Sequence, residues 1–441
     1  MIQPSLPDRC VLTNITVPAA LISGYRLEAL DGPVQDGLAR TAIGWAGGQF
    51  RPLADLDTAP KIDASGLVAL PLLAEAHVHL DKTRTISATG FSDGTLMGAI
   101  ELLSAHMMTC DFDEVLERMR AAAEEACARG VRLLRTHIDC FSLPENVPAW
   151  HAAQQVRREM APRLRLQFAT LSGITRMPGD DFEEHCRQIA AADGILGAFV
   201  PPGAVDPALL DSFLNTATRF GLDVDFHIDE GLDAGVCNVA TLARSIARTG
   251  YAGRVVAGHC CALSMLPAEE RDRALDLVAA SGMVVVTLPQ TNLFLQDRTK
   301  GHTPRHRGLT LIHELRARGV PVAIGTDNVG DAFYPFGDYD LLTLFGNTIA
   351  TGHLDGDPGG WLRAITDVPT RALGITDTCH IAPGHAADLM LLPARDWTGI
   401  IGTKPAQRQI VHSGVAYHAK PPANGASKSA EQQISQDARQ P

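Results

Sequence analysis

Two histidines separated by one residue, His77 and His79, are the first side chains of this sequence whose type and spacing suggest chemistry. They follow the apolar run 66–76, which predicts a buried strand. Residues i and i+2 of a strand point to the same side, so a divalent cation could bridge the two imidazoles. Two histidines make half of a metal site, and the other half must come from elsewhere in the chain.

His227 and Asp327 are the candidates for that other half, because each closes a further strand-like apolar run. Three imidazoles and one carboxylate suit Zn²⁺ or Fe²⁺, and a hydrolytic site leaves one coordination position for water. A bound cation lowers the pKa of that water toward about 7. We therefore expect a Zn²⁺ or Fe²⁺ ion at His77, His79, His227 and Asp327, with an activated water as the nucleophile.

Such a site also needs groups that move protons. Glu230 follows His227 by three residues, where a carboxylate could donate a proton to a ring nitrogen and later to a departing amine. His259 could polarise an oxygen or orient the attacking water, and Asp327 could accept a proton as well as bind the metal. We expect Glu230, His259 and Asp327 to be the catalytic residues.

Eight short apolar runs, separated by stretches with helical patterning, could position these side chains. The predicted strands are 67–79, 131–139, 164–170, 195–200, 222–229, 254–259, 282–288 and 320–327. The predicted helices between them are 112–129, 147–160, 180–192, 207–220, 239–249, 267–280 and 310–318. Parallel strands need such crossovers, so the pattern predicts an α/β fold of the (β/α)8 TIM-barrel type. All candidate ligands then lie at the C-terminal ends of the strands, where this fold carries its active sites.

The two ends of the chain have a different pattern. Short strands with turns occupy 10–17 and 41–46, and the same style returns at 387–392 and 409–414. We expect residues 1–65 and 379–420 to combine into one small β-sandwich beside a barrel formed by 66–378. Residues 421–441 are rich in Ala, Ser and Gln without periodicity, which predicts a disordered tail.

Composition narrows the possible partners and the compartment. The formal net charge is −12 and no dense Lys/Arg run is present, which argues against nucleic-acid or anionic-membrane partners. Nine cysteines without a CxxC pair fit free thiols better than a disulfide framework. No signal peptide or bilayer-spanning apolar run is visible, so we expect a cytoplasmic protein.

Taken together, the motifs resemble those of the amidohydrolase superfamily, in particular its cytosine deaminase-like branch. The segments that carry this resemblance are 77–83 (HVHLDKT), 135–139 (RTHID), 227–230 (HIDE), 258–259 (GH), 292–298 (NLFLQDR) and 325–329 (GTDNV). The resemblance spans the chain apart from the tail and implies a single metal ion. The fourth predicted strand, 195–200, has no lysine that could bridge two metals, which supports the same expectation.

Departures from that branch bear on the substrate. Leu171 stands near the position of a glutamine that reads the pyrimidine amide edge in cytosine deaminase-like enzymes, and Asn328 and Phe333 replace an aspartate and a tryptophan. The LDKT segment is also similar to that of N-isopropylammelide aminohydrolases, which act on triazine rings. We expect Leu171, Asn328 and Phe333 to line the substrate pocket. Lys82 is either a substrate contact or a surface residue, and His137 either lines the pocket or packs beneath it.

The function expected from these residues is hydrolytic deamination of a small nitrogen heterocycle of the aminopyrimidine or aminotriazine type. Cyclic-amide hydrolysis by the same machinery is the alternative, and a non-catalytic barrel protein is a third possibility that the full set of candidate residues disfavours. The expected partner is a small heterocyclic substrate. Self-association is common in such families, so a homo-oligomer is a further expectation by analogy.

Overall fold

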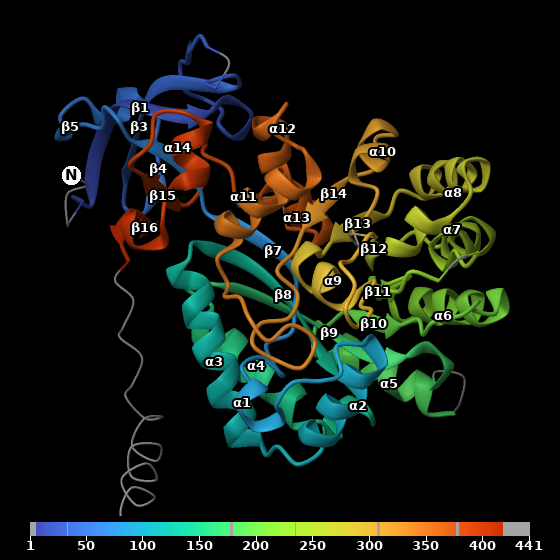
Figure 1. The fold of residues 1–441 in the computed structure, drawn as a ribbon. Helices are drawn as coiled ribbons and strands as arrows, with labels where there is room; N and C mark the ends of the chain where they lie inside the picture. The colour runs from blue at the N-terminus through green and yellow to red at the C-terminus, as the bar shows by residue number, and fades with distance from the viewer. Residues whose placement is uncertain are drawn as a thin grey trace, which may run out of the picture.

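The structure is a computed structural model that describes residues 6–32, 34–176, 180–233, 235–306, 309–375 and 379–417. The predicted tail 421–441 and the predicted domain boundary at residue 378 lie outside these residues. Two sheets organise the chain, a barrel sheet and a sheet built from both ends of the sequence (Figure 1). In the described part of the chain, no helix combines the length and the apolar character needed to cross a bilayer.

Eight parallel strands form the barrel sheet, as predicted. In spatial order they are β7 (Leu73–Val78), β8 (Val131–Asp139), β9 (Arg165–Gly173), β10 (Leu196–Phe199), β11 (Val224–Ile228), β12 (Val255–His259), β13 (Val284–Thr287) and β14 (Val322–Ile324). The first and last strands approach each other where Val78 bridges Asp327 and the Asp327 amide donates to the His77 carbonyl over 2.9 Å. This contact closes the barrel next to the predicted metal ligands.

Helices connect the strands and surround the barrel (Figure 1). The predicted crossovers are present as α3 (Phe112–Ala128), α4 (Pro148–Met160), α5 (Asp180–Ala191), α6 (Pro207–Phe220), α7 (Asn238–Thr249), α8 (Ala268–Ser281) and α10 (Ile312–Ala317). Helices without a prediction are α1 (Ile86–Thr89), α2 (Leu96–Met107), α9 (Pro289–Leu295), α11 (Leu341–Gly352), α12 (Pro358–Leu362), α13 (Asp367–Ala372) and α14 (Trp397–Gly402). Of these, α2 proves important for the pocket.

The second sheet combines both ends of the chain, as expected. Its strands are β1 (Arg9–Pro18), β2 (Glu28–Ala29), β3 (Leu38–Ala46), β4 (Gln49–Phe50), β5 (Lys61–Asp63), β6 (Val68–Pro71), β15 (Leu389–Leu392), β16 (Gln409–His412) and β17 (Val415–Ala416). The C-terminal β15 pairs with the N-terminal β6, so the red and blue strands lie together in Figure 1. A separate buried cluster that includes Ile15, Trp45 and Leu389 forms the core of this sheet.

The prediction of one strand over 67–79 was wrong. The segment forms two strands, because β6 belongs to the second sheet and β7 to the barrel, with Leu72 between them. The Leu72 amide donates to the Asp388 carbonyl next to the second sheet, whereas the Leu73 amide donates to the Gly130 carbonyl just before the barrel strand β8. Every residue of both strands is buried, so the apolar pattern shows no break where the chain changes sheet.

Candidate metal centre and active site

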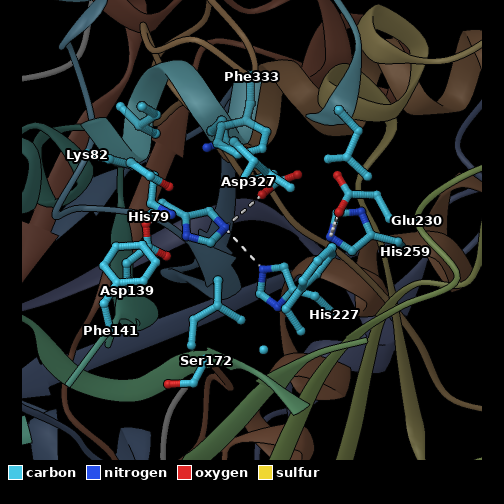
Figure 2. Close-up of a pocket in the computed structure, with 18 residues that line it drawn as sticks. His79, Lys82, Asp139, Phe141, Ser172, His227, Glu230, His259, Asp327 and Phe333 are labelled. Atoms are coloured by element: carbon cyan, nitrogen blue, oxygen red, sulfur yellow. Dashed lines mark hydrogen bonds and ion pairs between the residues drawn. The ribbon is translucent and has the colours of Figure 1, made fainter. Parts of the chain in front are cut away.

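The four predicted ligand side chains converge at the end of the barrel. The Nε2 atom of His227 lies 3.0 Å from Nε2 of His77 and 3.2 Å from Nε2 of His79. Asp327 Oδ1 lies 3.6 Å from Nε2 of His77. It lies 3.2 Å from Nε2 of His79, a contact that Figure 2 shows. The side chains come from β7, β11 and the turn after β14, which the barrel brings together although they are far apart in the sequence.

The donor set fits a divalent cation. Four ligand atoms placed tetrahedrally at about 2.1 Å from a metal lie roughly 3.4 Å from one another, close to the separations seen here. Hydrogen bonding alone does not satisfy the cluster, because His227 Nε2 faces two other ring nitrogens and carries at most one proton. Both carboxylate oxygens of Asp327 are buried and have no hydrogen-bond partner among the described residues. A shared cation would satisfy all four groups at once.

The protonation states favoured by burial also suit metal binding. Burial, reinforced by the neighbouring imidazoles, holds the pKa values of His77 and His227 well below the ordinary value, and burial with the adjacent Lys82 does the same for His79. These rings are therefore neutral at pH 7 and can donate lone pairs. Burial raises the pKa of Asp327 because it disfavours the ionised carboxylate, and a bound cation would offset this cost of ionisation.

Glu75 links the first and last strands of the barrel next to the ligands. Its Oε1 accepts from the His77 amide over 2.9 Å, and its Oε2 accepts from the amide and the hydroxyl of Thr326 over 3.0 and 2.5 Å. One buried carboxyl group thus links β7 to the residue that precedes Asp327. This link fixes the relative position of ligands from the first and last strands.

Three residues of the site share an unusual backbone conformation at strand ends. Asp229, His259 and Asp327 have φ values of 53°, 70° and 65°, in the left-handed region that residues other than glycine seldom adopt. Such strained positions persist only where surrounding contacts hold them, and they cluster at functional sites. Here Asp229 accepts from the amides of Asn238 and Val239 at the start of α7, which anchors the turn that carries Glu230.

Glu230 and His259 face each other beside the metal cluster. Glu230 Oε2 lies 3.8 Å from His259 Nε2, and burial, with a smaller effect of Asp327, raises the pKa of Glu230 to about 8 (Figure 2). His259 Nδ1 lies 3.0 Å from the Asn292 side-chain oxygen, so this nitrogen carries the proton and Nε2 presents its lone pair. Burial lowers the pKa of His259, which keeps the ring neutral.

His137 lies beneath the metal cluster and is absent from the pocket wall. Its ring centroid is 4.1 Å from that of His77, and its Nε2 is 3.2 Å from Asp225 Oδ1. Asp225 also pairs with Arg135 over 2.9 Å, and all three side chains are buried. Although burial opposes its ionisation, His137 and Arg135 hold the pKa of the Asp225 carboxyl below its ordinary value. These residues form the floor of the site.

Replacing Asp225 by alanine should lower the free energy of unfolding by about 3–5 kcal/mol, because Arg135 would be left as an unpaired buried charge. Urea unfolding of metal-free protein measures this loss. Glu159→Ala is the matched control, since it breaks the much more exposed Arg120–Glu159 pair and should cost about 0–1 kcal/mol. Equal effects of the two substitutions would contradict the role assigned to Asp225.

The cluster opens into a pocket of about 630 Å³, counted with the solvent at its mouth. Of the predicted substrate contacts, Lys82, Leu171, Asn328 and Phe333 line the pocket. Asn328 is held by Asp331, whose Oδ2 accepts from the Asn328 amide nitrogen over 2.7 Å. The roles of the individual residues stay predictions.

Several wall residues were not predicted from the sequence. Asp139, Phe141, Ser172 and Phe199 follow or end barrel strands, and α2 adds Leu96, Ile100 and Leu103. The spacing of those three residues on α2 puts them on one helix face. The sequence did contain a signal for this helix, because Thr95 is an N-cap whose side chain accepts from the Gly98 amide.

A separate group of metal-ligating residue types, His106, Cys110 and Glu114, lies at the junction of α2 and α3. The Arg118 guanidinium lies 3.7 Å from Cys110 Sγ and 2.5 Å from Glu114 Oε1. A cation at this place would meet a positive charge that already occupies two of its three ligands. We therefore do not assign a metal site there.

Comparisons with known proteins agree with this geometry. A family model described as "Amidohydrolase family" matches residues 179–411. A pterin deaminase from Rhizobium rhizogenes strain K84 is 34% identical over 418 residues, covering 93% of this chain and 94% of the relative. An N-isopropylammelide isopropyl amidohydrolase from Pseudomonas sp. strain ADP is 26% identical over 349 residues, covering 75% and 81% of the two chains.

Among solved structures, 5-methylcytosine deaminase from Klebsiella pneumoniae, liganded with 5-fluorocytosine, superposes with a TM-score of 0.76 at 23% identity. The match covers 95% of this chain and 100% of the other, and it supports the barrel fold. The family model covers more than half of the residues, and the first relative matches nearly the whole length of both chains. The chain belongs to the amidohydrolase family.

Proposed function

We propose that this protein is a metal-dependent aminohydrolase that releases ammonia from an amino-substituted nitrogen heterocycle. The observation that carries the proposal is the convergence of three imidazole nitrogens and the Asp327 carboxylate at the base of a pocket whose wall contains Glu230. The 34% identical relative is named a pterin deaminase, which supports a pyrimidine ring, alone or fused, as the reacting part of the substrate.

His77, His79, His227 and Asp327 would hold the metal ion. Zn²⁺ and Fe²⁺ both suit this donor set, and either ion, when bound, provides an activated water at neutral pH. Binding assays with each metal, scored by the stoichiometry of retained ion and by turnover, would decide between them.

The proton transfers fall to Glu230. A carboxyl group with a pKa near 8 can exchange protons close to neutral pH, where a general acid–base is most effective. In the proposed reaction Glu230 accepts one proton of the attacking water and delivers it to the adjacent ring nitrogen as the C–O bond forms. It then accepts the proton of the new hydroxyl group and delivers it to the amine, which leaves as ammonia while the ring carbonyl forms. His259, neutral and with its Nε2 lone pair toward Glu230, orients the water by accepting a hydrogen bond.

Ammonia release by metal-reconstituted protein across aminopyrimidines, pterins, aminotriazines and aminopurines tests the function. We expect release from at least one ring, with the carbonyl product formed in equal amount. Ring opening without ammonia would instead indicate cyclic-amide hydrolysis by the same residues. Failure of the metal-loaded protein to hydrolyse any ring would refute the proposal.

A cytoplasmic location and self-association are further proposals. Eight of the nine cysteines are buried, which suits thiols kept in a reducing compartment. Cell fractionation and light scattering of the purified protein test the two points separately.

A further inference from the structure

One corner of the pocket contains a buried ion pair that the mechanism above does not use. Lys82 Nζ donates to Asp139 Oδ2 over 2.7 Å, and both residues line the pocket (Figure 2). Lys82 follows the metal ligand His79 by three residues, whereas Asp139 ends β8. In the β8–β9 ladder Asp139 is the register partner of Leu171, so a charged group lies beside an apolar stretch of wall.

The pair is held firmly. Asp81 Oδ2 accepts from the Asp139 amide over 3.1 Å, and the Asp81 carbonyl accepts from Arg118 over 2.6 Å. The Phe333 ring covers the ammonium from another side, with its centroid 5.7 Å from Nζ. Burial opposes the charge on Lys82, but Asp139 and Asp81 outweigh it and raise the lysine pKa to about 12. The lysine is therefore charged, fixed in place and poorly accessible to water.

Each partner keeps hydrogen-bonding capacity toward the pocket. An ammonium group has three N–H donors, and Asp139 takes one of them. Asp139 Oδ1 accepts no hydrogen bond from any described residue, and the side chain is 15% exposed while that of Lys82 is 3% exposed. A charged pair of this kind carries a desolvation cost, which a bound ligand could offset by supplying the missing partners.

We propose that Lys82 and Asp139 bind the lactam edge of the substrate, the edge at which a ring carbonyl adjoins a ring N–H. Lys82 Nζ donates to the carbonyl oxygen, and Asp139 Oδ1 accepts from the neighbouring N–H. The assignment rests on the proposed aminohydrolase function and narrows its substrate class to amino-heterocycles that carry an oxo group next to a protonated ring nitrogen.

The lactam edge is chosen because Lys82 can only donate and Asp139 can only accept hydrogen bonds. A carboxylate accepts only and an ammonium donates only, so an adjacent pair matches a ligand edge with one donor beside one acceptor. An aminopyrimidine or aminotriazine that lacks an oxo group, and whose only amino group lies at the metal, would face Lys82 and Asp139 with ring-nitrogen lone pairs and C–H bonds. Such a ligand would leave Asp139 Oδ1 without a donor. A site built to hydrogen-bond one edge strongly rejects ligands that lack this edge.

Matched substrates test the edge. One set contains pterin and 2-amino-4-oxopyrimidine, a second their N3-methyl analogues, and a third 2-aminopyrimidine, which lacks the oxo group and adds no bulk. For the wild type we expect kcat/KM to fall by at least about 100-fold from the first set to either of the others. In Asp139→Ala, which removes the acceptor and makes room for a methyl group, the gap between parent and N-methyl ring should shrink to within about tenfold. Lys82→Met should likewise reduce the ratio of kcat/KM between the parent ring and the ring without an oxo group.

Asp388→Asn is the matched control, because Asp388 forms a similarly buried ion pair with Arg132, and neither residue lines the pocket. It should leave both ratios of kcat/KM unchanged.

Calorimetric binding of the same rings to the Glu230→Gln variant gives a readout that does not depend on turnover. Tight binding of the parent rings with at least about tenfold weaker binding of the analogues would support the lactam edge even if no ammonia is formed, in which case only the aminohydrolase function fails. Equal turnover or equal binding of parent and analogue rings would overturn the inference, and ammonia release would then leave the proposed function standing.

Discussion

Glu230→Gln should lower kcat for ammonia release by about 10²–10⁴-fold while the bound metal content stays the same. Glutamine keeps the size and polarity of the side chain but cannot accept and return a proton. Glu230 is buried in the pocket wall, 3.8 Å from His259, and its elevated pKa of about 8 suits proton exchange near neutral pH. Initial rates over a substrate series, with metal quantified in the same samples, measure the effect.

The matched control for this variant is Glu269→Gln. The Glu269 side chain is 91% exposed on α8, so its replacement should change neither kcat nor KM. The distinction between kcat and KM matters, because loss of a proton shuttle lowers kcat, whereas loss of a mere wall contact raises KM. Unchanged kcat in Glu230→Gln would remove Glu230 from the mechanism.

The double substitution His77→Ala and His79→Ala should abolish both metal retention and turnover. These two imidazoles supply half of the proposed donor atoms, so only His227 and Asp327 would remain as ligands. Two ligands hold a divalent cation far more weakly than four, so dialysed protein should contain only background metal. Elemental analysis after dialysis measures the retained ion.

His185→Ala provides the control for loss of a buried imidazole. His185 is buried on α5, outside the metal cluster, and burial lowers its pKa to about 4. This variant should keep one metal ion per chain and its turnover. A full equivalent of tightly bound metal in the double variant would show that the ion lies elsewhere.

Much of the architecture followed from local pattern. Alternating short apolar runs and amphipathic stretches predicted the strands and the crossover helices, and most of these helices begin and end within two residues of the expected positions. Both signals are local, because side-chain alternation and helical periodicity depend on neighbours within a few residues. Leu72 shows the limit of that information. Both faces of β6 and β7 are buried, so nothing in the residue types marks the point where the chain leaves one sheet for the other.

The sequence by itself determined the types of the chemical groups and the ends of the strands at which they lie. His77 and His79 share a face because of strand geometry, and His227, Glu230 and Asp327 follow strand ends that a parallel barrel must gather at one edge. Only the tertiary structure decided which groups meet. The pairing of Lys82 with Asp139, the floor of Arg135, His137 and Asp225, and the wall formed by α2 join residues from different strands and connections. These contacts depend on barrel closure and register, which bring distant residues within hydrogen-bonding distance and leave no mark on the local pattern.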